Sequence, residues 1–100
     1  MALTVADAQA QVDASIQALG GYWPPLANLA RLFEECGEVA RAVNQTHGAK
    51  RRKANEAEPA IADELGDALY VLIVLANSLD VDLAASLQAV IAKYAQRDIS

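Results

Sequence analysis

The chain has 100 residues, and its 13 acidic against eight basic residues give a net charge of −5, which excludes a basic nucleic-acid-binding surface. This length predicts one domain over residues 1–100, whose small core favours self-association. One cysteine excludes an intramolecular disulfide, and the apolar run 68–76 falls short of the roughly 20 residues that cross a bilayer. Since the N-terminus also lacks signal-peptide features, we expect a soluble, cytoplasmic protein without a membrane partner.

The first predicted helix covers residues 5–19. Thr4 can cap its N-terminus, and Asp7 lies in its first turn. Gly20 and Gly21 end it. Its apolar residues recur at three-to-four spacing, which predicts that one face is buried. They are Val5, Ala8, Val12, Ile16 and Leu19.

The second predicted helix covers residues 25–44 and begins after Pro24, since proline suits a first helical turn. Its expected buried side comprises Leu26, Leu29, Phe33, Ala40 and Val43. The polar connection that follows, residues 45–59, is long for a link between helices. Its basic run, residues 50–53, is a candidate lid over phosphates, although a charge run in a loop is more often simply solvated.

The third and fourth predicted helices cover residues 60–79 and 83–96, with Pro59 ahead of the third and Asp80 or Asp82 capping the fourth. From residue 68 onward the third helix is apolar on every side, which predicts a central position or a contact with a partner chain. The expected inward residues of the fourth helix are Leu83, Leu87, Val90, Ile91 and Tyr94. Without strand-like alternation, the sequence predicts an all-α fold, a four-helix bundle-like protomer that self-associates.

Two acidic clusters interrupt this apolar pattern, one in the second helix and one in the third. They comprise Glu34, Glu35 and Glu38, and Glu64 and Asp67. Residues three or four apart share a helix face, so antiparallel packing of the two helices would bring four or five carboxylates together. Their repulsion would raise their pKa values unless a cation neutralised them. Mg²⁺, which takes oxygen ligands, suits this set better than iron or zinc, whose sites call for histidine or cysteine.

Gly37 and Gly66 lie inside the two clusters, where a glycine costs about 1 kcal/mol in a helix interior. Close approach of a helix backbone or of a ligand would explain them. The competing interpretation is that the acids are solvated, or complement the dipole near the start of the third helix. One cluster would not decide between the two interpretations, whereas two clusters, each flanking a glycine in apolar sequence, favour a metal site.

At these residues the sequence resembles the all-α NTP pyrophosphohydrolases of the MazG-like superfamily. Their motif, E-E-x-x-E and then E-x-x-D after a variable spacer, matches the segments EECGE at 34–38 and ELGD at 64–67. The resemblance extends from about residue 22 to residue 97. It implies hydrolysis of a (d)NTP between its α- and β-phosphates, which gives a (d)NMP and pyrophosphate and serves nucleotide-pool house-cleaning.

The resemblance also implies roles for the acidic residues. Mg²⁺, with Mn²⁺ as its substitute, would be held by Glu35, Glu38, Glu64 and Asp67. The catalytic residues would be Glu34, Glu35 and Glu38, with Glu34 as a further ligand or as the base that positions the attacking water. Cys36 would pack as a small apolar residue.

Six residues are candidates for binding the nucleotide, each with a structural alternative. They are Trp23, Asn28, Tyr70, Asn77, Lys93 and Arg97. Lys93 and Arg97 would contact phosphates or complement a helix dipole. Trp23 would form a base pocket with Asn28, or anchor the core. Tyr70 would touch sugar or phosphate or pack between helices, and Asn77 would bind nucleotide or tie a helix end.

The expected partners are a nucleoside triphosphate and further copies of the chain, as a homodimer or homotetramer. Two rival functions stay open at this point. One is that of the related phosphoribosyl-ATP pyrophosphohydrolase, whose substrate is also a nucleotide pyrophosphate. The other is a non-enzymatic helical self-association module that has kept the acids as a structural metal site.

Overall fold

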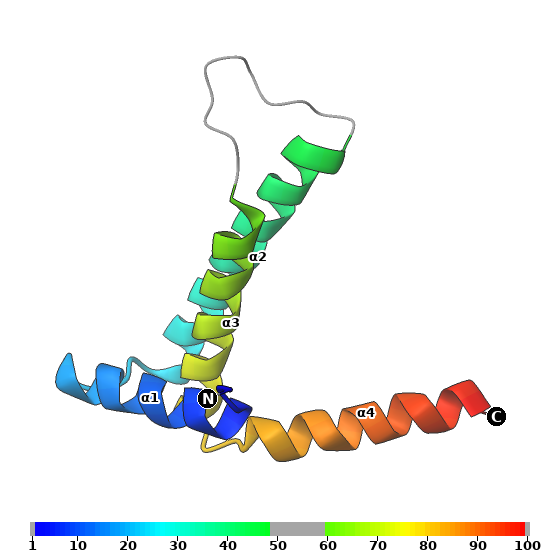
Figure 1. Cartoon of the computed structure of the whole chain (residues 1–100). Coiled ribbons are helices and arrows are strands. Elements are labelled where there is room, and N and C mark those ends of the chain that lie inside the picture. Colours follow the sequence, from blue (N-terminus) through cyan, green and yellow to red (C-terminus); the bar gives the residue numbers. More distant parts are fainter. Residues whose placement is uncertain (1, 49–59, 100) are drawn as a thin grey trace.

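The chain forms four helices in the computed structural model, which describes residues 2–48 and 60–99 (Figure 1). They are α1 (Val5–Ala18), α2 (Pro25–His47), α3 (Ile61–Ser78) and α4 (Leu83–Ile99). No strand occurs in these two ranges, which confirms the predicted all-α fold. α2 and α4 each continue three residues beyond their predicted ends. Pro59 and the basic run 50–53 lie outside the described residues.

α1 begins with the predicted cap. Oγ1 of Thr4 accepts a hydrogen bond from the backbone N–H of Asp7 at 3.0 Å, and the Asp7 carboxylate accepts one from the Thr4 N–H at 3.2 Å. This capping box satisfies donors that the first helical turn leaves without intrahelical partners. Gly20 and Gly21 adopt φ values of 109° and 103°, which glycine reaches without steric cost, and they confirm the predicted end of the helix.

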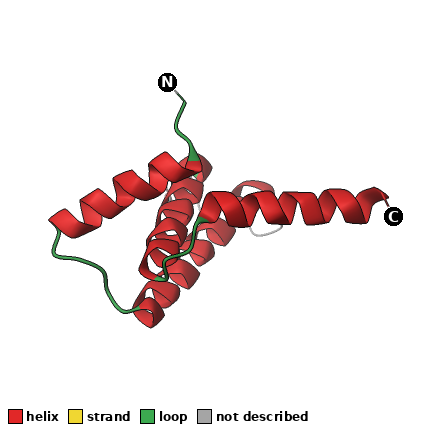
Figure 2. Ribbon diagram, turned by 90° about the horizontal axis from the view of Figure 1, so that it is seen from below, coloured by secondary structure: helices red, strands yellow, loops and turns green. Residues whose placement is uncertain are grey.

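α2 and α3 lie side by side and antiparallel as a long hairpin, and α1 crosses the end where α2 begins and α3 ends (Figure 1, Figure 2). The core is small. Val12 of α1 meets Ile73 and Val74 of α3, with Ala8 and Ile16 half-buried around them. The predicted stripe of α1 is therefore confirmed at its centre, and α3 is the central helix. Only at Leu19 does the stripe fail, because the helix ends before this exposed residue.

Polar side chains tie α1 to the corner between α3 and α4. Nε2 of Gln9 donates to Oδ1 of Asn77 at 2.8 Å and to the backbone oxygen of Val81 at 2.9 Å. Oε1 of Gln9 accepts from the N–H of Leu83 at 2.9 Å. Nδ2 of Asn77 donates back to the Gln9 backbone oxygen at 3.0 Å. Three helices are thus joined at one point.

The backbone conformation at the corner between α3 and α4 directs α4 away from the hairpin. Asp80 adopts a φ of 56°, and the N–H of Val81 donates to the backbone oxygen of Ala76 at 2.9 Å. Oδ1 of Asp82 then accepts from the N–H of Ala85 at 3.2 Å, so Asp82 is the residue that caps α4. Between α3 and α4 the chain bends by 109°.

Because α4 projects, the expected bundle does not close within one chain. The radius of gyration is 16.5 Å, against about 13 Å for a compact chain of this length. The inward positions predicted for Leu87, Val90, Ile91 and Tyr94 are wrong for the single chain, in which these side chains are exposed. Over the described residues no single helix is long and apolar enough to cross a membrane; α3 and residues 83–97 meet that test only as a bent pair.

The apolar face of α2 also lies outside. Of its predicted buried residues, Leu26, Phe33, Ala40 and Val43 are exposed and Leu29 is half-buried. Leu26 is 79% exposed and Phe33 69%, whereas the buried residues of α2 are Asn28 and Ala42. The prediction is wrong because α2 turns its carboxylate-bearing face, not its apolar face, toward α3.

Candidate metal centre

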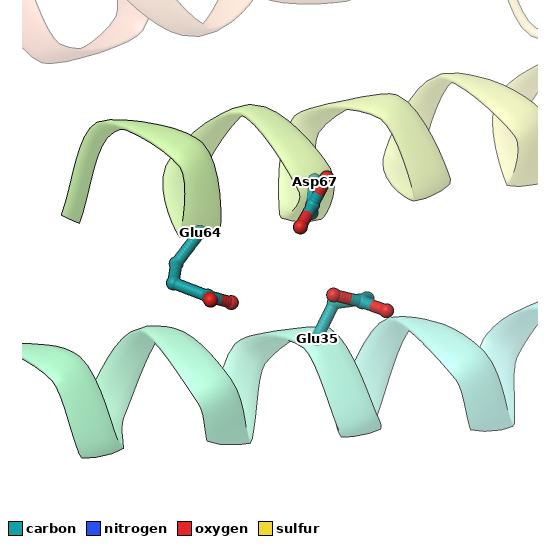
Figure 3. A group of neighbouring side chains, drawn as sticks. All are labelled: Glu35, Glu64 and Asp67. Atoms are coloured by element: carbon teal, nitrogen blue, oxygen red, sulfur yellow. The ribbon is translucent and has the colours of Figure 1, made fainter. Parts of the chain in front are cut away.

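Carboxylates from α2 and α3 meet inside the hairpin. Figure 3 shows Glu35 of α2 opposite Glu64 and Asp67 of α3, with the three side chains converging on the space between the helices. One oxygen atom from each carboxylate lies within 4.8 Å of the other two. Glu35 and Glu64 are half-buried, and Asp67 is exposed. The antiparallel packing expected from the sequence therefore does bring the two acidic clusters together.

Glu38 and Glu34 lie outside this converging group. The charge of Glu38 acts on Glu64, but its own carboxylate is exposed and lies 4.0 Å from the guanidinium of Arg41. Glu34 is exposed. Sequence reasoning missed Arg41 as a cation of the site, although its position three residues after Glu38 is a typical ion-pair spacing on a helix.

Crowding raises the pKa of Glu64 above its ordinary value of 4.5. Desolvation is the largest cause, and the negative charges of Glu38, Asp67 and Glu35 add to it. Both causes disfavour the ionised carboxylate. The metal-free site is therefore electrostatically unfavourable, and a bound cation would remove the repulsion.

The donor set fits a hard divalent cation. Mg²⁺ binds oxygen at about 2.1 Å in an octahedron, so two oxygens on one ion lie roughly 3 to 4.2 Å apart. The three carboxylate oxygens lie within 4.8 Å of one another, a distance that small side-chain rotations would close. The group that the described residues form contains carboxylates only, which suits Mg²⁺ or Mn²⁺ rather than zinc.

Gly37 and Gly66 are not explained by packing within the chain. A Cβ atom built on either residue would meet nothing within 4 Å beyond its own helical turn and chain neighbours. The close helix approach predicted for them is thus not found in the single chain. Gly37 lies about 200° around α2 from Glu35, on the outward side of the helix. Cys36, which the sequence predicts to be packed, is exposed instead.

Trp23, Asn28 and Tyr22 line a cavity of about 230 Å³ beside the start of α2. Asn28 is only 2% exposed, and its Nδ2 donates to the backbone oxygen of Trp23 at 3.1 Å. Trp23 itself is 60% exposed, so the alternative that it anchors the core does not apply. Arg31 also lines the cavity. Sequence reasoning missed this cation, whose signal is its position one helical turn after Asn28.

The remaining predicted residues lie elsewhere in the fold. Tyr70 lines a groove of about 330 Å³ between α1 and α3. The amide of Asn77 is hydrogen-bonded to Gln9, which corresponds to the helix-tying alternative. Lys93 and Arg97 belong to the second half of α4. This helix projects away from the hairpin that carries the carboxylates (Figure 1).

Fold and site together define an all-α protein whose central hairpin carries a carboxylate centre suited to a divalent cation. The family described as the MazG nucleotide pyrophosphohydrolase domain matches residues 24–99. The chain belongs to this family and is a MazG-type nucleotide pyrophosphohydrolase.

Two relatives match nearly the whole chain. YpjD of Bacillus subtilis (strain 168) is 48% identical over 96 residues, which cover 95% of this chain and 86% of the relative. The crystal structure of YpjD has a TM-score of 0.85 and 45% identity, and the match covers 94% of this chain and 97% of that one. The crystal structure of the Bacillus-conserved MazG protein, a nucleotide pyrophosphohydrolase, has a TM-score of 0.80 and 45% identity, covering 93% and 90%.

Proposed function

We propose that the chain is a Mg²⁺-dependent enzyme that hydrolyses (d)NTP to (d)NMP and pyrophosphate in nucleotide-pool house-cleaning. The observation that carries the proposal is the convergence of Glu35, Glu64 and Asp67 inside the hairpin of a MazG-family chain. The relative described as a nucleotide pyrophosphohydrolase supports the class of reaction. A cytoplasmic location, where nucleotide pools lie, is part of the same proposal.

Four carboxylates hold the cation. Glu35, Glu64 and Asp67 already converge, and Glu38 joins them by turning away from Arg41, since an exposed ion pair of this kind is weak. Mn²⁺ substitutes for Mg²⁺ because it accepts the same oxygen ligands. A bound ion of this type neutralises phosphate charge and lowers the pKa of a coordinated water.

The chemistry needs a base and no covalent nucleophile. Water attacks the α-phosphorus, the bond from this atom to the oxygen that bridges to the β-phosphate breaks, and pyrophosphate leaves with the bonding electron pair. Glu34, exposed on the same turn of α2 as Glu35, takes the proton of the attacking water.

The nucleoside lies toward the first turns of α2. Trp23 offers an exposed ring on which any base can stack, and Asn28 fixes the backbone that carries this ring. Tyr70, one turn after Asp67 on α3, is a further contact for sugar or phosphate. Asn77 supports the substrate only indirectly, by holding α1 in place.

The outward apolar faces of α2, α3 and α4 support assembly as a homodimer or homotetramer. Among the residues that the structure describes, sixteen large apolar side chains are exposed in the single chain. A protein of 100 residues cannot leave that much apolar surface in water without favouring association. The second copy is therefore part of the working enzyme.

The test is pyrophosphate release from a panel of canonical and modified NTPs and dNTPs, with Mg²⁺ and with EDTA. Wild-type protein should release pyrophosphate only with the metal, and Glu35→Gln should reduce the rate at least about 100-fold. Asp63→Asn is the matched control, because Asp63 is an exposed acid next to Glu64 that lies outside the converging group. No release across the panel would overturn the proposed substrate class, and release from phosphoribosyl-ATP alone would assign the rival reaction.

A further inference from the structure

The cavity of about 230 Å³ beside the start of α2 has a largely apolar wall. Ile16 and Leu19 line it from the end of α1, and Val74 lines it from α3. Tyr22 lines it as well, and the hydroxyl of this residue donates a hydrogen bond to Oδ1 of Asp13 at 2.6 Å. The Tyr22 hydroxyl proton is therefore used within the chain and is not available to a ligand in the cavity.

The amide of Asn28 leaves an acceptor open to this cavity. Its Nδ2 donates to the backbone oxygen of Trp23, whereas its Oδ1 accepts no hydrogen bond from another described residue. Over the described residues no buried side-chain polar atom lacks a partner, so this oxygen is not sealed inside the protein. Because Asn28 is only 2% exposed and lines the cavity, its Oδ1 opens into the cavity.

Arg31 brings a positive charge to the same cavity. It is half-buried, and its guanidinium forms neither an ion pair nor a hydrogen bond with another described residue. Glu35 follows at a spacing at which arginine and glutamate can pair, yet Arg31 lines the cavity instead. Side chains on a helix lean toward its N-terminus, which brings the guanidinium toward Trp23. A half-buried charge without a partner is unfavourable, so the cavity suits a ligand that accepts hydrogen bonds from Arg31.

The open acceptor and the open donors together describe the edge of the ligand. A phosphate would accept from Arg31, but its oxygens would be repelled by Oδ1 of Asn28, which is also an acceptor. A carbonyl beside a ring N–H satisfies both side chains, because the carbonyl accepts from the guanidinium and the N–H donates to Oδ1. Guanine, hypoxanthine, uracil and thymine have this edge, and we call them oxo bases. Adenine and cytosine, the amino bases, have an amino group in place of that carbonyl, which sets donors against the guanidinium.

The cavity lies where the proposed function places the nucleoside. Arg31 is one helical turn, roughly 6 Å along α2, from Glu35 of the carboxylate group, on the side of Trp23. The exposed ring of Trp23 can stack on any base, so stacking does not choose among bases. The choice of base is therefore left to the hydrogen-bonding groups of the cavity.

We infer that Arg31 and Asn28 select the base, so that the enzyme prefers nucleotides with an oxo base over those with an amino base. This inference rests on the proposed function and names its substrate class. Arg31 donates to the carbonyl of the base, Oδ1 of Asn28 accepts from its ring N–H, and Trp23 stacks on its face. Two such hydrogen bonds give a preference of about 10- to 100-fold in kcat/KM.

The first experiment uses two pairs of substrates that differ only at this edge. ITP and ATP differ by an oxo or an amino group on the same purine, and UTP and CTP differ in the same way on a pyrimidine. With Mg²⁺, the wild type should prefer ITP over ATP and UTP over CTP by about 10- to 100-fold in kcat/KM.

Arg31→Met keeps the length of the side chain and removes its charge and its donors. It should lower kcat/KM for ITP and UTP by about the same factor, while ATP and CTP lose far less. Arg31→Lys, which keeps a point charge without the planar fork, should retain part of the preference. Asp63→Asn, an exposed acid outside the carboxylate group, is the control and should keep both preferences.

Two outcomes of this experiment would overturn the inference. One is equal kcat/KM for the oxo and amino members of each pair in the wild type. The other is an equal loss on all four substrates in Arg31→Met, which would place Arg31 at the phosphates. Hydrolysis of none of the four is a different result, because it overturns the proposed function, and the binding experiment then decides the inference.

The second experiment measures binding without hydrolysis. Trp23 is the only tryptophan of the chain, so its fluorescence reports a base that stacks on it. In EDTA, titration with IMP should quench this fluorescence with a Kd about 10-fold lower than titration with AMP, and Arg31→Met should remove the difference. Equal Kd values in the wild type, a preference that survives in Arg31→Met, or no quenching by either nucleotide would overturn the inference. Trp23→Phe, which keeps a stacking ring and removes the signal, is the control for the origin of the quenching.

Discussion

α1 and α2 use their two faces in opposite ways. α1 places its apolar stripe against α3, with Val12 in the core, and leaves polar residues in water. α2 places the face with Asn28 and Glu35 against α3 and leaves Leu26 and Phe33 outside. Both helices have apolar residues at helical spacing, so the spacing alone cannot distinguish them.

The difference shows that an apolar stripe predicts a covered face but not what covers it. When a hairpin interior is filled by functional carboxylates, the apolar surface has to be buried elsewhere. In this chain the outer stripe of α2, with Leu26 and Phe33, stays exposed in the single chain, and other copies are the cover that the proposed function assigns to it. The four predictions below test that contrast between the two helices, from the largest expected effect to the smallest.

Phe33→Asp is expected to have the largest effect. Phe33 is 69% exposed in the single chain, so an aspartate there would cost little if the chain worked alone. Inside an interface, an unpaired carboxylate costs about 3–5 kcal/mol. We expect a lower melting temperature and a shift to a smaller mass in light scattering.

Leu19→Asp is the control for this substitution, since Leu19 is 82% exposed and lies at the end of α1 outside the stripe of α2. It should leave mass and melting temperature close to those of the wild type. If Phe33→Asp behaved like this control, the outer stripe of α2 would not be an interface.

Mg²⁺ bound at the carboxylates on the inner face of α2 should stabilise the folded chain. A ligand that binds only the folded state at 100 times its Kd adds about 2.7 kcal/mol by mass action. We expect millimolar Mg²⁺ to raise the melting temperature of the wild type and EDTA to reverse the effect. Glu38→Gln should reduce the rise, whereas Asp63→Asn should keep it. A wild type that melts at one temperature with and without Mg²⁺ would count against a metal site.

Gln9→Ala tests the polar tie that joins α1 to the corner of α3 and α4. The substitution removes three side-chain hydrogen bonds of about 0.5–1.5 kcal/mol each, so we expect a loss of about 2 kcal/mol in the free energy of unfolding. Gln17→Ala, at an exposed position of the same helix, should cost far less. Equal losses in denaturant melts would show that the corner does not depend on Gln9.

Acidification should have the smallest effect on the free energy of unfolding, and the sign of this effect follows from the pKa of Glu64. The pKa of this carboxyl is raised in the folded chain, so the folded state binds a proton more readily than the unfolded state. Its unfavourable contribution to stability is present at neutral pH and is lost as the pH falls through the raised pKa. In EDTA, the wild type should lose less stability on mild acidification than Glu64→Gln does. The opposite order would indicate that cations already pair with the cluster.

The sequence predicts much of the fold because its signals are local. The Thr4 cap, the Gly20–Gly21 end and the helical spacing each depend on neighbouring residues, and all are found in the structure. The convergence of Glu35 with Glu64 and Asp67 follows from antiparallel packing of two helices.

Other features could not be derived from one chain's sequence. The direction of α4 depends on the φ of Asp80 and on a hydrogen bond between Gln9 and Leu83, which is 74 positions away. The prediction that Phe33 is buried is wrong for the single chain. Hydropathy indicates that a residue favours burial, but it does not say whether the surface that covers it belongs to the same chain. The phosphate-binding roles expected of Lys93 and Arg97 stay predictions.

The outward stripe of α2 also bears on how quickly the chain reaches its working form. The hairpin and α1 can form from contacts within one chain, on the microsecond to millisecond scale of local helical structure. If the proposed assembly covers Leu26 and Phe33, this last step requires a collision between chains, so it is second order and its rate falls with dilution. In that case a newly made chain at low concentration would first exist as a folded monomer with exposed apolar surface, and the lifetime of this monomer would be set by how often it meets another copy.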